Sequence, residues 1–198
     1  VWMSAVAYGT SNYLVVFTQY DNTLGRHLLY GRLVTPAGVA VGAGPFPIGP
    51  RDQNELYPDV AFDGTNFLVV WQQQPGTGSD PPDISVAAAR VSEAGVVLDA
   101  NGFPVSNTGH GSYTPRVAFG GGQYLVMWQD GRNTANYTEG FDIYGARIDP
   151  NGVLLDGTVA TGGIRISGYP MPEAGYPRAT WTGSGFLVTW TAYGIYAP

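Results

Sequence analysis

A short apolar segment recurs four times along this 198-residue chain and restricts its possible folds more than any other feature. The copies begin at residues 13, 67, 124 and 186, so that successive copies lie 54, 57 and 62 residues apart. Each copy starts and ends with an aromatic residue, and each follows a four-residue turn and another short apolar run. Two β-rich runs around a tight turn are typical of a hairpin, so the sequence predicts one hairpin at the start of every repeat.

The second half of the repeat recurs in the first three copies. Turns at residues 35–38, 92–95 and 149–152 are each followed by an apolar triplet, and another apolar segment comes several residues later. We interpret each repeat as four strands in two tight hairpins, so that the last strand follows directly on the turn. Residues 84–94 contain an alanine run that could form a short helix by propensity, but the repeat places it on a third strand. We therefore expect almost no helix.

Four-stranded units that recur with an aromatic residue in each predict an all-β fold, a β-propeller of antiparallel blades. We expect one domain over residues 1–198, with blades at about 1–50, 51–110 and 111–170 and an incomplete blade at 171–198. The aromatic residues that close the second strands should fill the space between blades; they are Phe17, Trp71, Trp128 and Trp190. We predict a four-bladed ring with an incomplete last blade. The alternatives are a fragment of a longer chain and a ring that another copy completes.

Two stretches carry a resemblance to a known group of proteins. Residues 60–71 read Val-Ala-Phe-Asp-Gly-Thr-Asn-Phe-Leu-Val-Val-Trp, and residues 142–147 read Asp-Ile-Tyr-Gly-Ala-Arg. With these patterns the chain resembles the tandem blade-like repeats of secreted bacterial propeller proteins, over nearly its whole length. The resemblance implies a secreted or cell-surface location and binding to a ligand or a surface, and it transfers no functional residue.

The composition excludes several classes of function. The chain has no cysteine, which excludes disulfides, thiolate nucleophiles and cysteine-ligated metal sites. All nine basic residues are arginine, which excludes lysine Schiff-base chemistry. The net charge of −6 argues against a nucleic-acid partner, whose phosphates need a basic surface. No apolar run is long enough for a membrane span.

Polar and aromatic residues gather in the longer connections, which should share one face of a propeller. Amide, carboxylate, arginine and tyrosine side chains suit the hydroxyl groups and the C–H face of a sugar. The candidate ligand-binding residues are Tyr20, Asp21, Arg26, Asp52, Asn54, Asp130, Arg132, Tyr137, Glu139 and Tyr169. We therefore expect a non-catalytic extracellular binding or adhesion module whose partner is a glycan or a protein surface.

Two other functions stay open. One is a structural or assembly unit, in which the incomplete last blade pairs with another copy or with the rest of a longer protein. The other is a small glycoside hydrolase, which needs two carboxylates about 5–10 Å apart. The carboxylates available for that reaction are Asp52, Glu55, Asp130, Glu139 and Glu173. Because the sequence holds no motif of an enzyme family, we expect the chain not to be an enzyme.

Charged residues also occupy equivalent positions on the first strand of three blades: Asp59, Arg116 and Arg178. If this strand lines the propeller axis, the three side chains lie in a central channel and could hold an ion or a column of water. Calcium is the one metal we considered, since residues 63–66 and 149–156 carry oxygen ligands of the kind it prefers. Turn chemistry alone explains these residues, and we favour it over calcium binding, so we expect no metal site and no cofactor.

Overall fold

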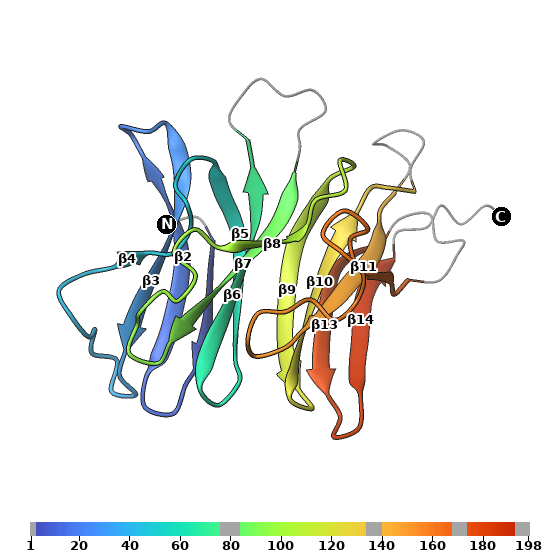
Figure 1. The fold of residues 1–198 in the computed structure, drawn as a ribbon. Helices are drawn as coiled ribbons and strands as arrows, with labels where there is room; N and C mark the ends of the chain where they lie inside the picture. The colour runs from blue at the N-terminus through green and yellow to red at the C-terminus, as the bar shows by residue number, and fades with distance from the viewer. Residues whose placement is uncertain (1–2, 76–83, 134–139, 168–173, 193–198) are drawn as a thin grey trace.

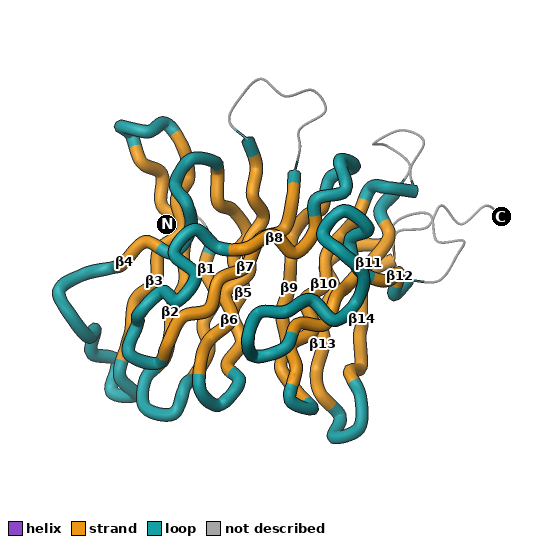
Figure 2. The backbone as a smooth tube through the Cα atoms, viewed as in Figure 1, coloured by secondary structure: helices purple, strands orange, loops and turns teal. Residues whose placement is uncertain are grey.

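The computed structural model describes residues 3–75, 84–133, 140–167 and 174–192. Within these ranges the chain consists of β-strands, turns and loops, and it contains no helix (Figure 2). The described residues therefore include no helix that could cross a membrane. The all-β class predicted from the sequence is confirmed.

The strands form four antiparallel sheets, each built from consecutive strands. The first sheet contains β1 (Ser4–Tyr8), β2 (Tyr13–Asp21), β3 (Arg26–Val34) and β4 (Phe46–Pro47). The second contains β5 (Asn54–Phe62), β6 (Asn66–Gln74), β7 (Ser85–Ser92) and β8 (Phe103–Ser106). The third contains β9 (Ser112–Gly120), β10 (Gln123–Asp130), β11 (Asp142–Ile148) and β12 (Ile164–Arg165). The fourth contains β13 (Ala174–Trp181) and β14 (Phe186–Ala192).

The four sheets stand side by side as the blades of a propeller (Figure 1). The first strand of each blade is the innermost one: β1 contacts β5, β5 contacts β9, and β9 contacts β13. The short hairpins between first and second strands lie at one end of the blades (Figure 1). The predicted β-propeller is thus confirmed, with three four-stranded blades and, in the described residues, two strands of a fourth.

The hydrophobic core lies between the blades and follows the two-residue period of the second strands. One face of β2 packs with the facing side of β6 in a first cluster, which includes Val16, Val69 and Trp71. The other face of β6 packs on β10 in a second cluster. Part of β10 packs on β14 in a third. A strand between two blades is buried on both faces, which explains why these segments are apolar throughout rather than alternating.

The tryptophans occupy the interfaces as expected. Trp71 and Trp128 are fully buried, and Trp190 is half-buried against the third blade. The alanine run lies on β7, where Ala87 pairs with Trp71 across the ladder. Small side chains there leave room for the indole ring between the blades. The run is therefore a strand, as the repeat predicted, because burial between two sheets outweighs helix propensity.

The face of the first blade that points away from the second blade, here called its outer face, is more exposed than the equivalent face of the second blade. Val6 on β1 is 58% exposed, whereas Val60, its counterpart on β5, is 6% exposed. Phe17 is likewise half-buried, whereas its counterpart Trp71 is fully buried. The second blade is covered by the first on this side, while among the described residues no blade covers the first.

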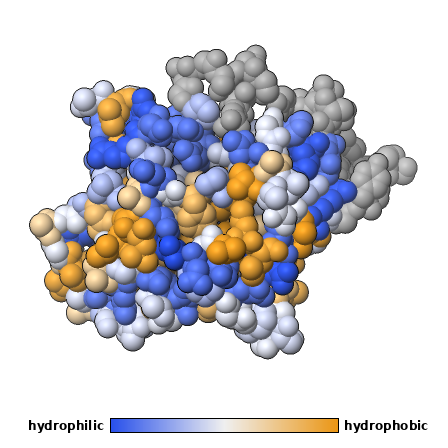
Figure 3. All heavy atoms as spheres, in the orientation of Figure 1, coloured by the Kyte–Doolittle hydropathy of each residue, from blue (hydrophilic) through white to orange (hydrophobic). Residues whose placement is uncertain are grey.

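The fourth strand does not lie where the tight hairpin predicted it. After the turn, the apolar triplets of the first three blades make one isolated bridge each, such as Val34 with Ala40. Their first residues, Val39, Val96 and Val153, are 61%, 58% and 55% exposed. The chain then crosses to the later apolar segment, which forms β4, β8 or β12. The prediction that the triplet forms the fourth strand was wrong, because its pairing with the third strand stops after this single bridge. The middle residues Val97 and Leu154 still pack against the core between blades. Figure 3 shows apolar surface among hydrophilic atoms on the side of the molecule that faces the viewer.

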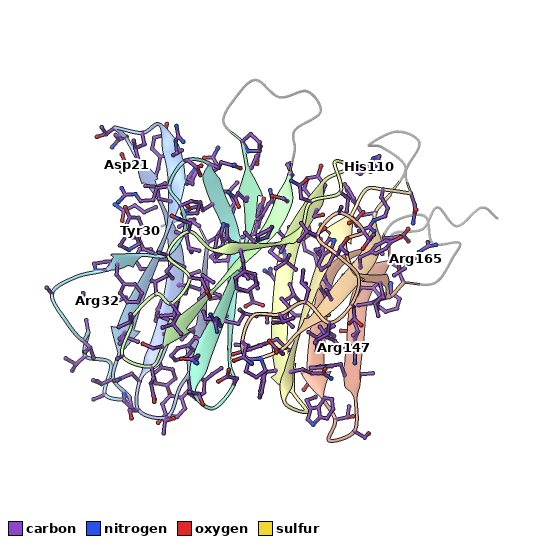
Figure 4. All side chains as sticks on the ribbon, viewed as in Figure 1. Asp21, Tyr30, Arg32, His110, Arg147 and Arg165 are labelled. Carbon is purple, nitrogen blue, oxygen red and sulfur yellow. The ribbon has the colours of Figure 1, made fainter. Side chains whose placement is uncertain are left out.

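Guanidinium–carboxylate pairs hold this crossing segment in the second and third blades. Arg90 donates from Nε and Nη2 to the two oxygens of Asp99, both at 2.9 Å. Arg147 makes the same fork with Asp156 at 2.8 and 2.7 Å (Figure 4). In the first blade Arg32 instead donates to a backbone carbonyl, at 3.1 Å.

Candidate functional site

The innermost strands of blades two, three and four share an irregularity. Tyr57, Thr114 and Tyr176 adopt positive φ angles of 51°, 46° and 53°. In each case a proline follows, and the ladder between the first two strands shifts register nearby. Side chains other than glycine rarely adopt this conformation, and a bulge of this kind re-aims the residues that follow it. The residue after each proline is Asp59, Arg116 or Arg178.

These three charged residues line a common cavity of about 330 Å³. All four innermost strands or their immediate neighbours contribute to its wall. The lining residues are Met3, Ser4, Ala5, Tyr57, Pro58, Asp59, Arg116 and Arg178. We call this the axial cavity. The structure thus brings together the residues that the sequence placed in a central channel. Whether an ion or water occupies the cavity stays a prediction.

Burial dominates the electrostatics of Asp59. Desolvation raises the pKa of its carboxyl group above the ordinary value, and this effect outweighs the hydrogen bond that the Val117 N–H donates to Oδ2 at 3.0 Å. The charge of Arg116 favours the ionised carboxylate, and that of Arg178 does so to a smaller degree. The pKa of Arg116 is lowered, chiefly by burial, with Asp59 opposing that shift.

The two arginines are held in the same way. Arg116 Nη1 donates to the carbonyl of Pro115 at 3.0 Å, and Arg178 Nη1 donates to the carbonyl of Pro177 at 3.1 Å. The proline before each arginine therefore lies at the strand irregularity and also accepts a hydrogen bond from the arginine through its carbonyl oxygen. Chemically, the axial cavity combines a carboxyl group whose pKa is raised by burial with two guanidinium groups that can donate hydrogen bonds to a ligand.

Five predicted ligand residues, Tyr20, Asp21, Arg26, Asp52 and Asn54, meet at the junction of the first two blades. Asp21 Oδ1 accepts the N–H groups of Thr23 and Leu24 at 2.8 and 3.0 Å. These bonds, that of Leu24 first, lower the pKa of Asp21.

The other members of this group also bind protein atoms. Asn54 Oδ1 accepts the N–H of His27 at 2.9 Å, and Arg26 donates to the Asp52 carbonyl. The Tyr20 ring is half exposed and lies edge-on to the His27 ring, with centroids 5.1 Å apart. These residues shape the turn after β2 and join the first two blades. Asp21, labelled in Figure 4, lies at the end of β2.

Asp130 and Arg132 form a separate, buried group in the third blade. Arg132 donates from Nε to Oδ1 and from Nη2 to Oδ2 of Asp130, both at 2.7 Å. Trp128 Nε1 donates to Oδ2 at 2.8 Å, and the Arg132 guanidinium lies 3.8 Å from the centre of the Tyr144 ring. Since Asp130 has no exposed surface, this group secures the tryptophan rather than facing a ligand.

Several candidates lie elsewhere or outside the described residues. Glu55 is buried and accepts the N–H groups of Leu29 and Arg51 at 2.6 and 2.8 Å, which ties the first blade to the second. Burial raises the pKa of Glu55. The remaining candidates lie outside the described residues; they are Tyr137, Glu139, Tyr169 and Glu173.

The oxygen ligands considered for calcium act within their own turns. Asp63 Oδ1 accepts the N–H groups of Thr65 and Asn66, both at 2.7 Å. Asp149 Oδ1 accepts those of Asn151 and Val153 at 2.9 and 2.8 Å. No group of three or more acidic or histidine side chains that could hold a metal ion is present in the part of the chain that the structure describes.

Sequence reasoning missed Met3 and Tyr57 as lining residues of the axial cavity. A signal for the second was present, because Tyr-Pro or Thr-Pro precedes the charged residue in three repeats. Met3 precedes β1 and has no counterpart of that kind.

Solved structures share this fold. An α-L-arabinofuranosidase from Lactobacillus brevis matches with a TM-score of 0.58 and 13% identity, over 96% of this chain and 64% of that one. A thermostable family-43 glycoside hydrolase matches with a TM-score of 0.59 and 15% identity, over 97% and 65%. An endo-arabinase from Bacteroides thetaiotaomicron matches with a TM-score of 0.61 and 13% identity, over 100% and 75%. This chain thus spans less than two thirds of the length of the first two enzymes.

No protein-family profile matches the sequence. No curated protein matches it either. At the identities above, the likeness to solved structures shows the fold: the part of the resemblance that concerns a propeller holds.

The structural neighbours also correct the expected function. We expected a non-catalytic binding or adhesion module and not an enzyme, whereas the three solved structures named above are glycoside hydrolases. That expectation was wrong. The repeat could not decide between the functions left open, because it specifies how the blades pack and not which side chains meet at the axis.

Proposed function

We propose that this chain is all or part of the catalytic propeller of a glycoside hydrolase, with its active site at the axial cavity. The observation that carries the proposal is the position of Asp59, a partly buried carboxyl group facing the axis of a fold found in arabinofuranosidase and arabinase structures. Cavities at such central positions are the usual place for a ligand site. The enzymes that share the fold support hydrolysis as the reaction.

In this proposal Asp59 is the general acid. Hydrolysis of a glycosidic bond needs one carboxyl group that gives its proton to the leaving oxygen as the bond to the sugar carbon breaks. A second carboxylate either takes a proton from the attacking water or attacks the sugar carbon itself. Because burial raises the pKa of Asp59, this group keeps its proton to a higher pH than an exposed aspartate and suits the first role.

The second carboxylate must come from outside the described lining of the cavity, where Asp59 is the one acidic residue. The reaction needs no cofactor, and we propose none. We also propose a secreted or cell-surface location of the kind found for tandem-repeat propellers, because a polymeric glycan would be met there.

The test is release of reducing sugar from arabinan, fructan, xylan and pectic polysaccharides by the purified chain. Asp59→Asn should lower kcat by about 10²–10⁴-fold, the usual contribution of a general acid. Asp63→Asn is the matched control, because Asp63 lies in the same hairpin and an asparagine can keep both of its turn hydrogen bonds. Circular dichroism of each variant checks that it folds. Absence of hydrolysis on every glycan, or equal activity of both variants, would contradict the proposal.

A further inference from the structure

The charge of the axial cavity is opposite to the charge of the protein. The chain carries a net charge of −6, whereas the cavity wall holds two guanidinium groups and one carboxyl group. Its formal charge is therefore +1 when Asp59 is ionised, and +2 when Asp59 holds its proton. A positively charged cavity attracts a small anion, whereas the negatively charged surface of the rest of the protein repels it.

The two arginines differ from most other arginines of the chain. Within the described ranges, five arginines lie within 4.0 Å of a carboxylate oxygen, and Arg116 and Arg178 are not among them. Each guanidinium carries five N–H donors, and the proline carbonyl accepts from one of them. Arg178 is exposed and Arg116 half-buried, so their remaining donors can reach a ligand in the cavity.

We infer that the axial cavity binds a sugar that carries a carboxylate, such as a uronic acid residue of an acidic polysaccharide. Planar guanidinium groups bind a carboxylate through paired, charge-assisted hydrogen bonds, which a neutral sugar cannot offer. The cavity volume of about 330 Å³ lies at the lower end of the range for ligand sites, which suits a small ligand. That the bound sugar is also the substrate rests on the proposed function. That the cavity binds it rests only on the charge, volume and lining of the cavity.

The experiment compares D-galacturonate with D-galactose, which differ in a carboxylate at one carbon, by isothermal titration calorimetry. Galacturonate should bind at least tenfold more tightly, and Arg178→Gln should remove that preference. Arg147→Gln should leave it unchanged, because the Arg147 guanidinium pairs with Asp156 outside the cavity lining. Acetate is the third ligand. Equal binding of the two sugars, a preference that survives Arg178→Gln, or acetate binding as tightly as galacturonate would each overturn the inference.

Asp59→Asn separates this inference from the proposed function. Because the variant loses a negative charge, it should bind galacturonate at least as tightly as the wild type while losing hydrolysis. Galacturonate binding without hydrolysis of any glycan would support the cavity inference and contradict the proposed function. Hydrolysis of neutral glycans with no preference for uronates would support the proposed function and overturn the inference.

Discussion

The exposed outer face of the first blade leads to a quantitative prediction. Val6 and Val60 occupy equivalent positions on β1 and β5, yet one is 58% and the other 6% exposed. Changing either to alanine removes the same atoms and the same strand preference. The difference between the two variants therefore measures burial between blades.

At Val60 the loss of two buried carbons costs about 1.6 kcal/mol, taking about 0.8 kcal/mol for each. The cavity left behind raises the cost to about 2–2.5 kcal/mol. At Val6 less than half of the side chain is removed from water, so the cost is at most about 0.7 kcal/mol. Val60→Ala should therefore destabilise the protein by about 1.5 kcal/mol more than Val6→Ala.

The assay is urea unfolding followed by tryptophan fluorescence, with the free energy of unfolding extrapolated to water. With a slope of about 2 kcal/mol per molar urea, the midpoint of Val60→Ala should lie about 0.5–1 M below that of Val6→Ala. Equal midpoints would refute the reasoning, because they would mean that the outer face of the first blade is covered in solution as completely as that of the second.

Three further predictions concern charged groups. Asp130→Ala should lower the free energy of unfolding by about 3–5 kcal/mol, measured in urea, because it leaves the Arg132 charge and Trp128 Nε1 without their buried partner. Asp156→Ala should cost about 1 kcal/mol or less in the same assay, because the side chain of its partner Arg147 is 45% exposed. A loss as large as that of Asp130→Ala would contradict this. Asp59→Asn should raise thermal stability at pH 7. The folded state binds the Asp59 proton more tightly than the unfolded chain does, so the wild type loses stability as the pH rises above 3.8, the ordinary pKa of an aspartate. This gain should vanish below that pH, and a gain that does not depend on pH would show that the Asp59 carboxyl is not its source.

The sequence predicted the blades because their packing is repeated in it. Val69 and Val126 recur at one register position and face the preceding blade in both cases. Because the repeat indicates which face of each strand is buried, the architecture and the burial of the tryptophans between blades could be predicted.

Features that depend on contacts between distant residues were not predictable in the same way. Asp130 holds Trp128 in the third blade, but its counterpart in the second blade is Gln73, so the repeat carries no sign of that group. The fourth strands form at the later apolar segment of the repeat. The sequence showed that segment but not that it, rather than the exposed triplet, pairs with the third strand. The axial position of Asp59 could be anticipated from the repeat, whereas its burial and the bulge at Tyr57 could not.

The most direct test of the proposed active site is the pH dependence of glycan hydrolysis by the wild type and by Asp59→Asn. If Asp59 is the general acid, wild-type kcat should fall as pH rises through a pKa above 3.8, and Asp59→Asn should lose both that limb and at least 100-fold of the rate. An unchanged rate and an unchanged profile in Asp59→Asn would contradict the assignment of the axial cavity as the active site.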